Sequence, residues 1–275
     1  MAMKRFRLFS IVLCGVMIVA GAVGGKTAAT ASAGAAAPIE EEGLRVSVGT
    51  FVVERGARLA LEIVRSDPCV CLCDPVWVRA VTLLDGFGET IREEPLDTPV
   101  DAIEWLGQIS LARGEGDEPL PEGAYTILVE TSAGAFSASA EVVPTQQVAR
   151  FGRFSASASV CGLELRVYRL ITEDDAGGEI TLRRGDRLMV ALAGNATTGF
   201  AWENALLYEY AVLRETEEPE YRAKPHPLEM VGFGGTFLFR YEAVDTGPQS
   251  FRFVYRRPWE SVEPEQVLEF AVAVY

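Results

Sequence analysis

Few residues in this chain could do covalent chemistry, and their surroundings do not favour it. The single histidine, His226, lies between two prolines in the segment "AKPHPLEM", which is typical of an exposed loop. A serine or cysteine nucleophile would depend on that histidine as its base. The adjacent carboxylates Asp174 and Asp175 are of a kind common in solvated loops, and the sequence contains no HExxH segment. The sequence therefore predicts a protein that is not an enzyme.

The cysteines could form disulfides or bind a metal. Apart from Cys14 in the N-terminal segment, there are Cys69, Cys71 and Cys73 in "SDPCVCLCDP" and the distant Cys161. Disulfides are the expected state in an oxidising compartment, whereas structural zinc sites prefer two to four residues between paired cysteines. In a straight strand, Cys69 and Cys73 would lie roughly 13 Å apart, which is too far for a bond. We expect disulfides among these four residues, with the pairing left open, and no metal site.

Three segments in the C-terminal half carry residue types suited to binding. They are "NATTGFAW" (195–202), "VGFGGTF" (231–237) and "YRRPWES" (255–261). Two adjacent β-branched threonines are an unusual choice for a turn. Glycines allow a backbone to approach a partner closely, and tryptophan and arginine are typical of interface hot spots. These segments are therefore candidate binding loops.

Alternating strands flank the three segments and would position them. "EITLRRGDRLMVALAG" precedes the first segment, "TFLFRYEA" follows the second, "SFRFVY" precedes the third, and "QVLEFAVAVY" closes the chain. Each has apolar residues at every second position, which predicts strands of a β-sandwich. Because the three segments occupy every second connection between strands, we expect them at the same end of that sandwich.

A second set of alternating strands precedes these, beginning at residue 44. Examples are "GLRVSV", "RLALEIV", "AYTILVE" and "AFSASAEV". The Gly-x-Tyr turn before the last hairpin loosely resembles the end of an immunoglobulin-like module. The pattern breaks at "VVPTQQVARFGRF", where we place a domain boundary. The predicted fold is all-β, with two immunoglobulin-like β-sandwich domains in tandem, over residues 44–145 and 150–275.

The chain opens with a pattern typical of secretion. Lys4, Arg5 and Arg7 precede an apolar run, and small residues follow up to Ala33. We interpret residues 1–33 as a signal peptide and leader, and residues 34–43 as a flexible linker rich in alanine and acidic residues. An uncleaved membrane anchor is the alternative. The expected location is extracytoplasmic, either periplasmic or secreted, with tethering to a membrane only if the segment is retained.

The charge of the chain limits its partners. The net charge is −14, and loss of residues 1–33 would leave 21 basic and 39 acidic residues, a net charge of −18. Such a surface repels nucleic acid and anionic lipid. We therefore expect no nucleic-acid partner.

The three candidate loops resemble, in order, those of the chagasin-type inhibitors of papain-family cysteine proteases. That family carries an Asn-Pro-Thr-Thr-Gly-aromatic-x-Trp loop, a Gly-x-Gly-Gly loop and an Arg-Pro-Trp loop on an immunoglobulin-like sandwich. The matching residues are Asn195, Thr197, Thr198, Gly199, Phe200 and Trp202, then Gly232, Gly234 and Gly235, then Arg257, Pro258 and Trp259. The resemblance covers about residues 150–275 and does not extend to residues 44–145.

The resemblance implies a reversible inhibitor whose three loops block the cleft of a papain-family protease, without a cofactor. It places the variable residue Phe233 near a pocket of the protease, while Trp202 and Phe200 could instead anchor the core. Thr197, Thr198 and Trp259 show no structural need in the sequence and are expected to make the contacts. Ala196 departs from the family's proline, a loss that should reduce the stiffness of the loop. The alternative function is a cell-surface adhesion or scaffold module that binds something other than a protease.

Overall fold

The computed structural model describes most of the chain from residue 45 onward. The described residues are 45–65, 76–100, 104–113, 118–148, 157–160, 163–206, 211–224 and 234–275. The predicted signal peptide, the linker, the four cysteines of the predicted disulfides and His226 lie outside these ranges. None of the helices in the described ranges has the length and apolar character needed to span a bilayer.

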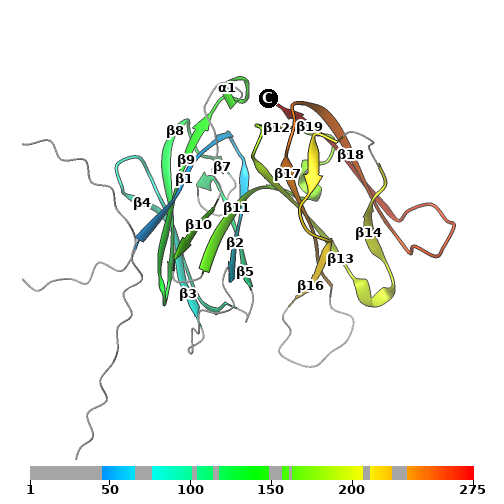
Figure 1. The fold of residues 1–275 in the computed structure, drawn as a ribbon, viewed down its shortest axis with the longest axis horizontal. Coiled ribbons are helices and arrows are strands. Elements are labelled where there is room, and N and C mark those ends of the chain that lie inside the picture. Colours follow the sequence, from blue (N-terminus) through cyan, green and yellow to red (C-terminus); the bar gives the residue numbers. More distant parts are fainter. Residues whose placement is uncertain are drawn as a thin grey trace, which may run out of the picture. The chain divides into compact units, whose positions relative to one another are not determined.

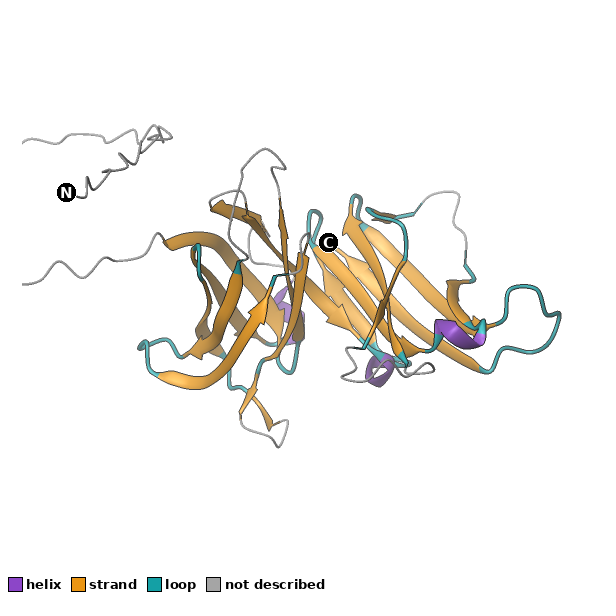
Figure 2. Cartoon of the chain, turned by 90° about the horizontal axis from the view of Figure 1, so that it is seen from below, coloured by secondary structure: helices purple, strands orange, loops and turns teal. Residues whose placement is uncertain are grey.

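Strands account for nearly all the regular structure of the described residues, as their alternating sequences predict (Figure 2). The first eleven are β1 (Arg45–Glu54), β2 (Arg58–Arg65), β3 (Trp77–Leu84), β4 (Thr90–Pro99), β5 (Glu104–Ser110), β6 (Ala112–Arg113), β7 (Glu118–Pro119), β8 (Gly123–Thr131), β9 (Gly134–Val143), β10 (Ser157–Val160) and β11 (Leu163–Ile171). The remaining eight are β12 (Glu179–Leu182), β13 (Arg187–Gly194), β14 (Ala201–Asn204), β15 (Leu213–Glu215), β16 (Glu220–Ala223), β17 (Gly235–Ala243), β18 (Gly247–Arg256) and β19 (Gln266–Val274). The helical turns among the described residues are α1 (Thr145–Val148), η2 (Glu173–Asp175) and η3 (Ala196–Thr198).

The N-terminal strands form a β-sandwich around one apolar core. One layer is the five-stranded sheet β1-β9-β8-β3-β4, and β2, β5 and β11 pair in the other. Along β8 and β9 every second residue is buried, for example Ile127 and Phe136, which lie in the core with Leu61 of β2. This alternation is the one that the sequence predicts for strands with one face on a core.

The C-terminal strands form a second apolar core that is rich in aromatic rings. The four-stranded sheet β12-β19-β18-β14 packs against β13 and β17. Phe239 of β17 lies 4.8 Å from Phe253 of β18, and Phe251 lies 5.0 Å from Phe270 of β19, measured between ring centroids. Tilted and offset ring pairs at such distances add to the stabilisation from burial alone. The predicted all-β sandwich fold is confirmed by this packing.

One long sheet runs through both cores, in the strand order β15-β17-β13-β11-β2-β5 (Figure 1). Strand β11 pairs antiparallel with β2 along Leu163–Leu170 and parallel with β13 along Arg169–Ile171. Its residues Leu163, Leu165 and Val167 belong to the N-terminal core, whereas Ile171 belongs to the C-terminal core. The two cores therefore meet within β11, in a unit that spans residues 42–275. The domain limits that we place at 44–145 and 150–275 remain a prediction.

Candidate functional site

The register of the strands brings the three candidate loops to one end of the C-terminal sandwich. Gly194, the last residue of β13, pairs with Gly235, the first residue of β17. Ala201, the first residue of β14, pairs with Arg256, the last residue of β18. The end of β13, the start of β14, the start of β17 and the end of β18 therefore lie at the same end of the sandwich, and the three loops connect to these strand ends. We call this end, formed by residues 195–200, Gly234 and residues 257–265, the loop edge.

The first loop is a short 3-10 turn held by its own side chains. Asn195 caps η3, and its Oδ1 atom accepts hydrogen bonds from the backbone N of Thr197 at 3.1 Å and from the Thr197 hydroxyl at 2.7 Å. The Thr198 hydroxyl donates to the backbone oxygen of Asn195 at 2.6 Å. Gly199 ends the turn with a φ of 80°, a left-handed conformation that glycine adopts without strain.

These bonds correct one expectation from the sequence. Thr197 and Thr198 do have a structural need, because both hydroxyls close the turn while their side chains stay exposed. Asparagine and threonine are residues whose short side chains readily bond to nearby backbone in this way. The turn is thus held by hydrogen bonds at the point where Ala196 replaces the family's proline.

The third loop lies directly on the first. The Nε atom of Arg257 donates to the backbone oxygen of Thr198 at 3.2 Å, and its guanidinium lies 4.6 Å from the centre of the Phe200 ring. The Trp259 ring covers Gly199 so closely that a Cβ atom there would lie 2.5 Å from the ring. Even so, 69% of Trp259 is exposed. Loops one and three therefore form one surface with a large exposed aromatic ring.

Aromatic residues beneath the loops anchor them to the core. Trp202 is only 4% exposed, and its Nε1 donates to the backbone oxygen of Ala193 at 2.8 Å, so it is a core anchor. Phe200 is half-buried and stacks on Tyr255 at 5.1 Å. The Tyr255 hydroxyl in turn accepts a hydrogen bond from the backbone N of Asn195 at 2.8 Å. We therefore assign Phe200 and Trp202 to support of the loop edge.

The second loop is described only at its two stems. Gly232 and Phe233 lie outside the described residues, whereas Gly234 and Gly235 lie within them. The backbone N of Lys224 donates to the oxygen of Gly234 at 3.2 Å, which closes the base of the loop. A Cβ atom on Gly235 would collide with the backbone oxygen of Arg222 and the ring of Tyr221. Gly235 thus permits β16 to lie close against β17.

The described residues of the loop edge have the character of a binding surface. The side chains of Thr197, Thr198, Pro258 and Trp259 are exposed there. The charge of Arg257 is matched by Glu260, whose carboxylate lies 2.9 Å from its Nη1 atom. Among the described residues, no group of three or more histidine, cysteine, aspartate or glutamate side chains is arranged to hold a metal.

Two supporting residues were not singled out from the sequence. Tyr255 belongs to both a predicted strand and the third candidate segment, and its hydrogen bond to the first loop joins positions 60 apart in the chain. Glu260 directly follows the Arg-Pro-Trp segment, and its ion pair with Arg257 spans three residues in a turn. The ion pair of Glu260 could have been predicted from the spacing of opposite charges. The hydrogen bond of Tyr255 could not, because it depends on how the two sheets stack.

The C-terminal strands form a β-sandwich that presents a capped turn and an exposed tryptophan at one end, an arrangement suited to binding through loops. The comparisons with known proteins narrow this class. The model of the chagasin family of peptidase inhibitors (I42) matches residues 181–274. Amoebiasin-1 from Entamoeba histolytica is 34% identical over 89 residues, which cover 32% of this chain and 82% of amoebiasin-1. Chagasin from Trypanosoma cruzi is 27% identical over 93 residues, which cover 32% of this chain and 81% of chagasin.

The crystal structure of the cysteine protease inhibitor EhICP2 from Entamoeba histolytica aligns at 27% identity with a TM-score of 0.34, covering 38% of this chain and 94% of that one. The chain belongs to the chagasin family of peptidase inhibitors, through its C-terminal residues. The resemblance that the three loops indicate is thereby confirmed.

Proposed function

We propose that this protein is a reversible inhibitor of papain-family cysteine proteases and that it blocks the active-site cleft with the loop edge. The first loop, with Thr197 and Thr198 at its tip, would enter the cleft. The glycine loop and the Arg257-Pro258-Trp259 loop would hold the protease on either side. Phe233, at the variable position of the glycine loop, would face a specificity pocket. The protein would have no catalytic activity of its own and would need no cofactor.

One observation carries this proposal most strongly, namely the joining of the first and third loops into one surface. Arg257 bonds to the Thr198 backbone, and Trp259 packs on Gly199, yet Thr197, Thr198 and Trp259 all remain exposed. A surface already ordered before binding loses little conformational entropy when it docks. The hydrogen bonds of Asn195 replace, in this respect, the stiffness that a proline at position 196 would provide.

The shape of the first loop also explains how it would resist cleavage. A protease cuts a substrate that lies extended through its cleft, as a strand does. Residues 196–198 instead form a 3-10 turn whose ends are tied by the Asn195 cap and by the hydrogen bond from Gly199 N to the Ala196 oxygen at 3.0 Å. The protease would therefore meet a closed turn and not the extended backbone that it cleaves.

A titration of papain tests the proposal. The chain from residue 34 onward is added to a fixed amount of active papain, and residual activity is measured against a fluorogenic peptide substrate. We expect competitive and reversible inhibition at or below micromolar concentration, with the inhibitor still intact by mass spectrometry after incubation. Absence of inhibition at micromolar protein, with correctly folded material, contradicts the proposal. Binding of a non-protease partner that is unaffected by Thr198→Ala would favour the adhesion module instead.

We also propose that the two sandwiches are immunoglobulin-like modules in tandem and that the protein works outside the cytoplasm. In the N-terminal sandwich, the Tyr125 hydroxyl donates to the backbone oxygen of Pro121 at 2.8 Å, an arrangement typical of the tyrosine corner of immunoglobulin-like domains. The charged and apolar N-terminal segment supports export. Fractionation of expressing cells, with N-terminal sequencing of the exported form, tests the location and the cleavage site.

A further inference from the structure

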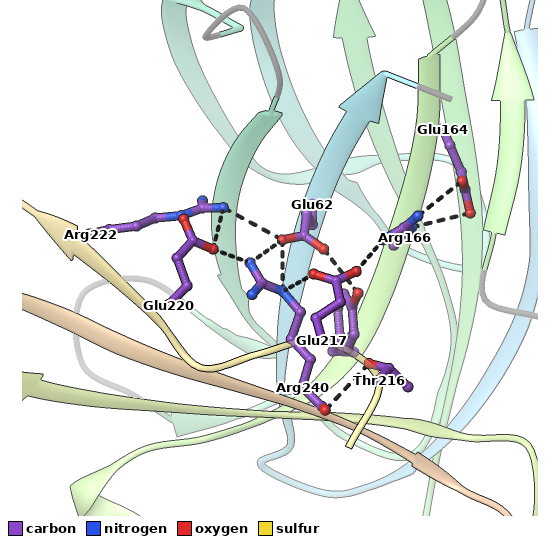
Figure 3. A network of polar contacts seen from close by, with 9 residues as sticks. Glu62, Glu164, Arg166, Thr216, Glu217, Glu220, Arg222 and Arg240 are labelled. Carbon is purple, nitrogen blue, oxygen red and sulfur yellow. Dashed lines mark hydrogen bonds and ion pairs between the residues drawn. The ribbon is translucent and has the colours of Figure 1, made fainter. Parts of the chain in front are cut away.

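A buried ion pair connects the two halves of the protein. Arg240 of β17 is 1% exposed and Glu62 of β2 is 0% exposed. The Nη2 and Nε atoms of Arg240 donate to Glu62 Oε1 at 2.6 and 3.1 Å (Figure 3). Strands β13 and β11 lie between β17 and β2 in the sheet, and in a flat sheet side chains three strands apart would not meet. The sheet therefore bends so that these two side chains touch.

Every oxygen of the buried Glu62 carboxylate has a partner. Besides Arg240, its Oε1 atom lies 3.6 Å from Arg222 Nη2, and its Oε2 atom accepts a hydrogen bond from the Tyr168 hydroxyl at 2.9 Å. Both cations come from the C-terminal sandwich. A buried carboxylate needs such partners, because desolvation of a charge without compensation is very unfavourable. The Glu62 carboxylate thus fixes the positions of the Arg240 and Arg222 guanidinium groups by ion pairing.

The same network extends into the short strand β16. Glu220 of β16 accepts from Arg240 Nη2 at 2.7 Å and from Arg222 Nε at 2.7 Å (Figure 3). Burial raises the pKa of Glu220, but hydrogen bonds and attraction from Arg222 and Arg240 outweigh it and lower the pKa to about 2. None of the four residues of β16 is fully buried. The strand is held by its pairing with β17, by the packing of the Tyr221 ring on Phe237 and by these ion pairs.

Strand β16 leads directly into the second loop of the loop edge. Ala223 pairs with Gly235, and Lys224 N donates to the Gly234 oxygen at 3.2 Å, so β16 and β17 are the two stems of residues 225–233. The Tyr221 ring lies over Gly235 and 4.7 Å from the Phe237 ring. A shift of β16 would therefore move one stem of the glycine loop relative to the first loop.

From this chain of contacts we infer that Glu62, in the N-terminal sandwich, is a positioning residue for β16, the stem that pairs with Gly235 and leads into the glycine loop, acting through Arg240 and Arg222. The inference rests on the proposed function, because the glycine loop is taken to contact the protease. It assigns the N-terminal sandwich a part in inhibition that sequence similarity to the family does not cover, since the match begins at residue 181.

The test compares two glutamate-to-glutamine variants of the full chain from residue 34. Glu62→Gln removes the negative charge that pairs with Arg240 and faces Arg222 of β16. Glu54→Gln is the matched control, because Glu54 is also a largely buried carboxylate of the N-terminal half, paired at 2.7 Å with Arg169, and it has no contact with β16 among those described. Three quantities are measured: the melting temperature, the inhibition constant for papain at 25 °C with both variants folded, and hydrogen exchange of residues 220–224 relative to residues 201–204.

We expect both variants to lower the melting temperature, but only Glu62→Gln to weaken inhibition, by about tenfold, since a loosened β16 must be ordered on binding. Only Glu62→Gln should speed exchange in residues 220–224. Equal inhibition constants and equal exchange for the two variants would overturn the inference.

Two further outcomes are decided in advance. If Glu62→Gln does not fold, Arg222→Gln takes its place, because this partly exposed side chain bonds to Glu220 and faces Glu62; it should give the same two changes at smaller size, and no change would overturn the inference. If the wild-type chain does not inhibit papain, the proposed function fails, while faster exchange confined to residues 220–224 still supports the positioning role of Glu62.

Discussion

The loop edge and the buried Glu62–Arg240 junction are held together by opposite means. At the loop edge, neutral hydrogen bonds accepted by the Asn195 side chain and the packing of Trp259 on Gly199 leave Thr197, Thr198 and Trp259 exposed. At the junction, full charges are removed from water and satisfied by one another. A surface that is to bind a partner must keep its apolar groups accessible, whereas a junction between two packed sandwiches must exclude other packing arrangements.

The difference predicts separate consequences of mutation. Truncation of an exposed side chain at the loop edge removes binding energy and leaves the fold intact. Removal of one partner from a buried ion pair leaves an uncompensated charge and unfolds the protein more readily. Variants at the loop edge should therefore affect inhibition with little loss of stability. Variants at the junction should lower stability first, and those that loosen β16 should weaken inhibition as well.

The largest effect is expected for Arg240→Met, which leaves the Glu62 carboxylate buried without its main partner. Loss of one member of a buried pair costs about 3 to 5 kcal/mol of unfolding free energy. Urea denaturation measures it. The matched control is Arg252→Met, because Arg252 pairs with Glu269 at 3.3 Å on the surface, and such exposed pairs contribute at most about 1 kcal/mol. Similar losses for the two variants would show that the junction is not held by its charges.

A large loss of binding is expected for Trp259→Ala, with little change in the melting temperature. The ring is rigid and mostly exposed, so its burial by a protease should contribute about 2 kcal/mol or more, roughly a 30-fold change in the inhibition constant. The control is Phe87→Ala, since Phe87 is 96% exposed on the turn between β3 and β4 and is equally apolar. Unchanged inhibition by Trp259→Ala would remove this loop from the proposed interface.

A smaller effect is expected for Gly199→Ala, a change at the loop edge that should lower stability. The left-handed backbone at Gly199 and the collision of a new Cβ with Trp259 should together lower the unfolding free energy by about 1 to 2 kcal/mol. Gly88→Ala provides the control, because Gly88 has a φ of 84° and open space around it. The excess over Gly88→Ala measures the contact with Trp259, and it should disappear in the double variant Gly199→Ala/Trp259→Ala. An excess that persists in the double variant would assign the cost to another neighbour.

Much of the loop edge could be predicted from the sequence because its information is local. Alternating residues define the strands, and the connection order alone places the three loops at one end of the sandwich. Local reasoning failed for the threonine hydroxyls, since a capping role depends on the turn that the chain adopts. Residues Gly232 and Phe233 lie outside the described residues, and their contacts stay a prediction.

The junction could not be predicted in this way. In "RLALEIV", Leu61 and Ile63 alternate with Glu62, a pattern that indicates a solvent-facing glutamate. Glu62 is nevertheless buried against Arg240. This partner lies 178 residues away in the chain, so a local pattern could not reveal it. The bend of the long sheet brings them together, and no short segment encodes that bend. The continuation of β11 into both cores could not be predicted from the sequence for the same reason.

The smallest effect concerns the far end of β13, opposite the loop edge. Asp186 precedes β13; burial raises the pKa of its carboxyl to about 6, against a partial lowering by the backbone N and the charge of Arg183. Its Oδ1 atom has no hydrogen-bond partner among the described residues. A carboxyl with a raised pKa in the folded state takes up a proton there first, so stability rises as the pH falls through 6.

From pH 7.5 to pH 5 this carboxyl should add about 1 kcal/mol to the unfolding free energy, because one pKa unit corresponds to about 1.4 kcal/mol. The contribution of Glu220, whose pKa is lowered to about 2, is lost only as the pH falls below 4.5, so it does not interfere in this window. Urea denaturation at both pH values measures the gain, and Asp186→Asn should reduce it while leaving inhibition of papain unchanged. An equal gain in Asp186→Asn would assign it to the general relief of acidic repulsion, and a change in inhibition would show that the two ends of β13 are coupled.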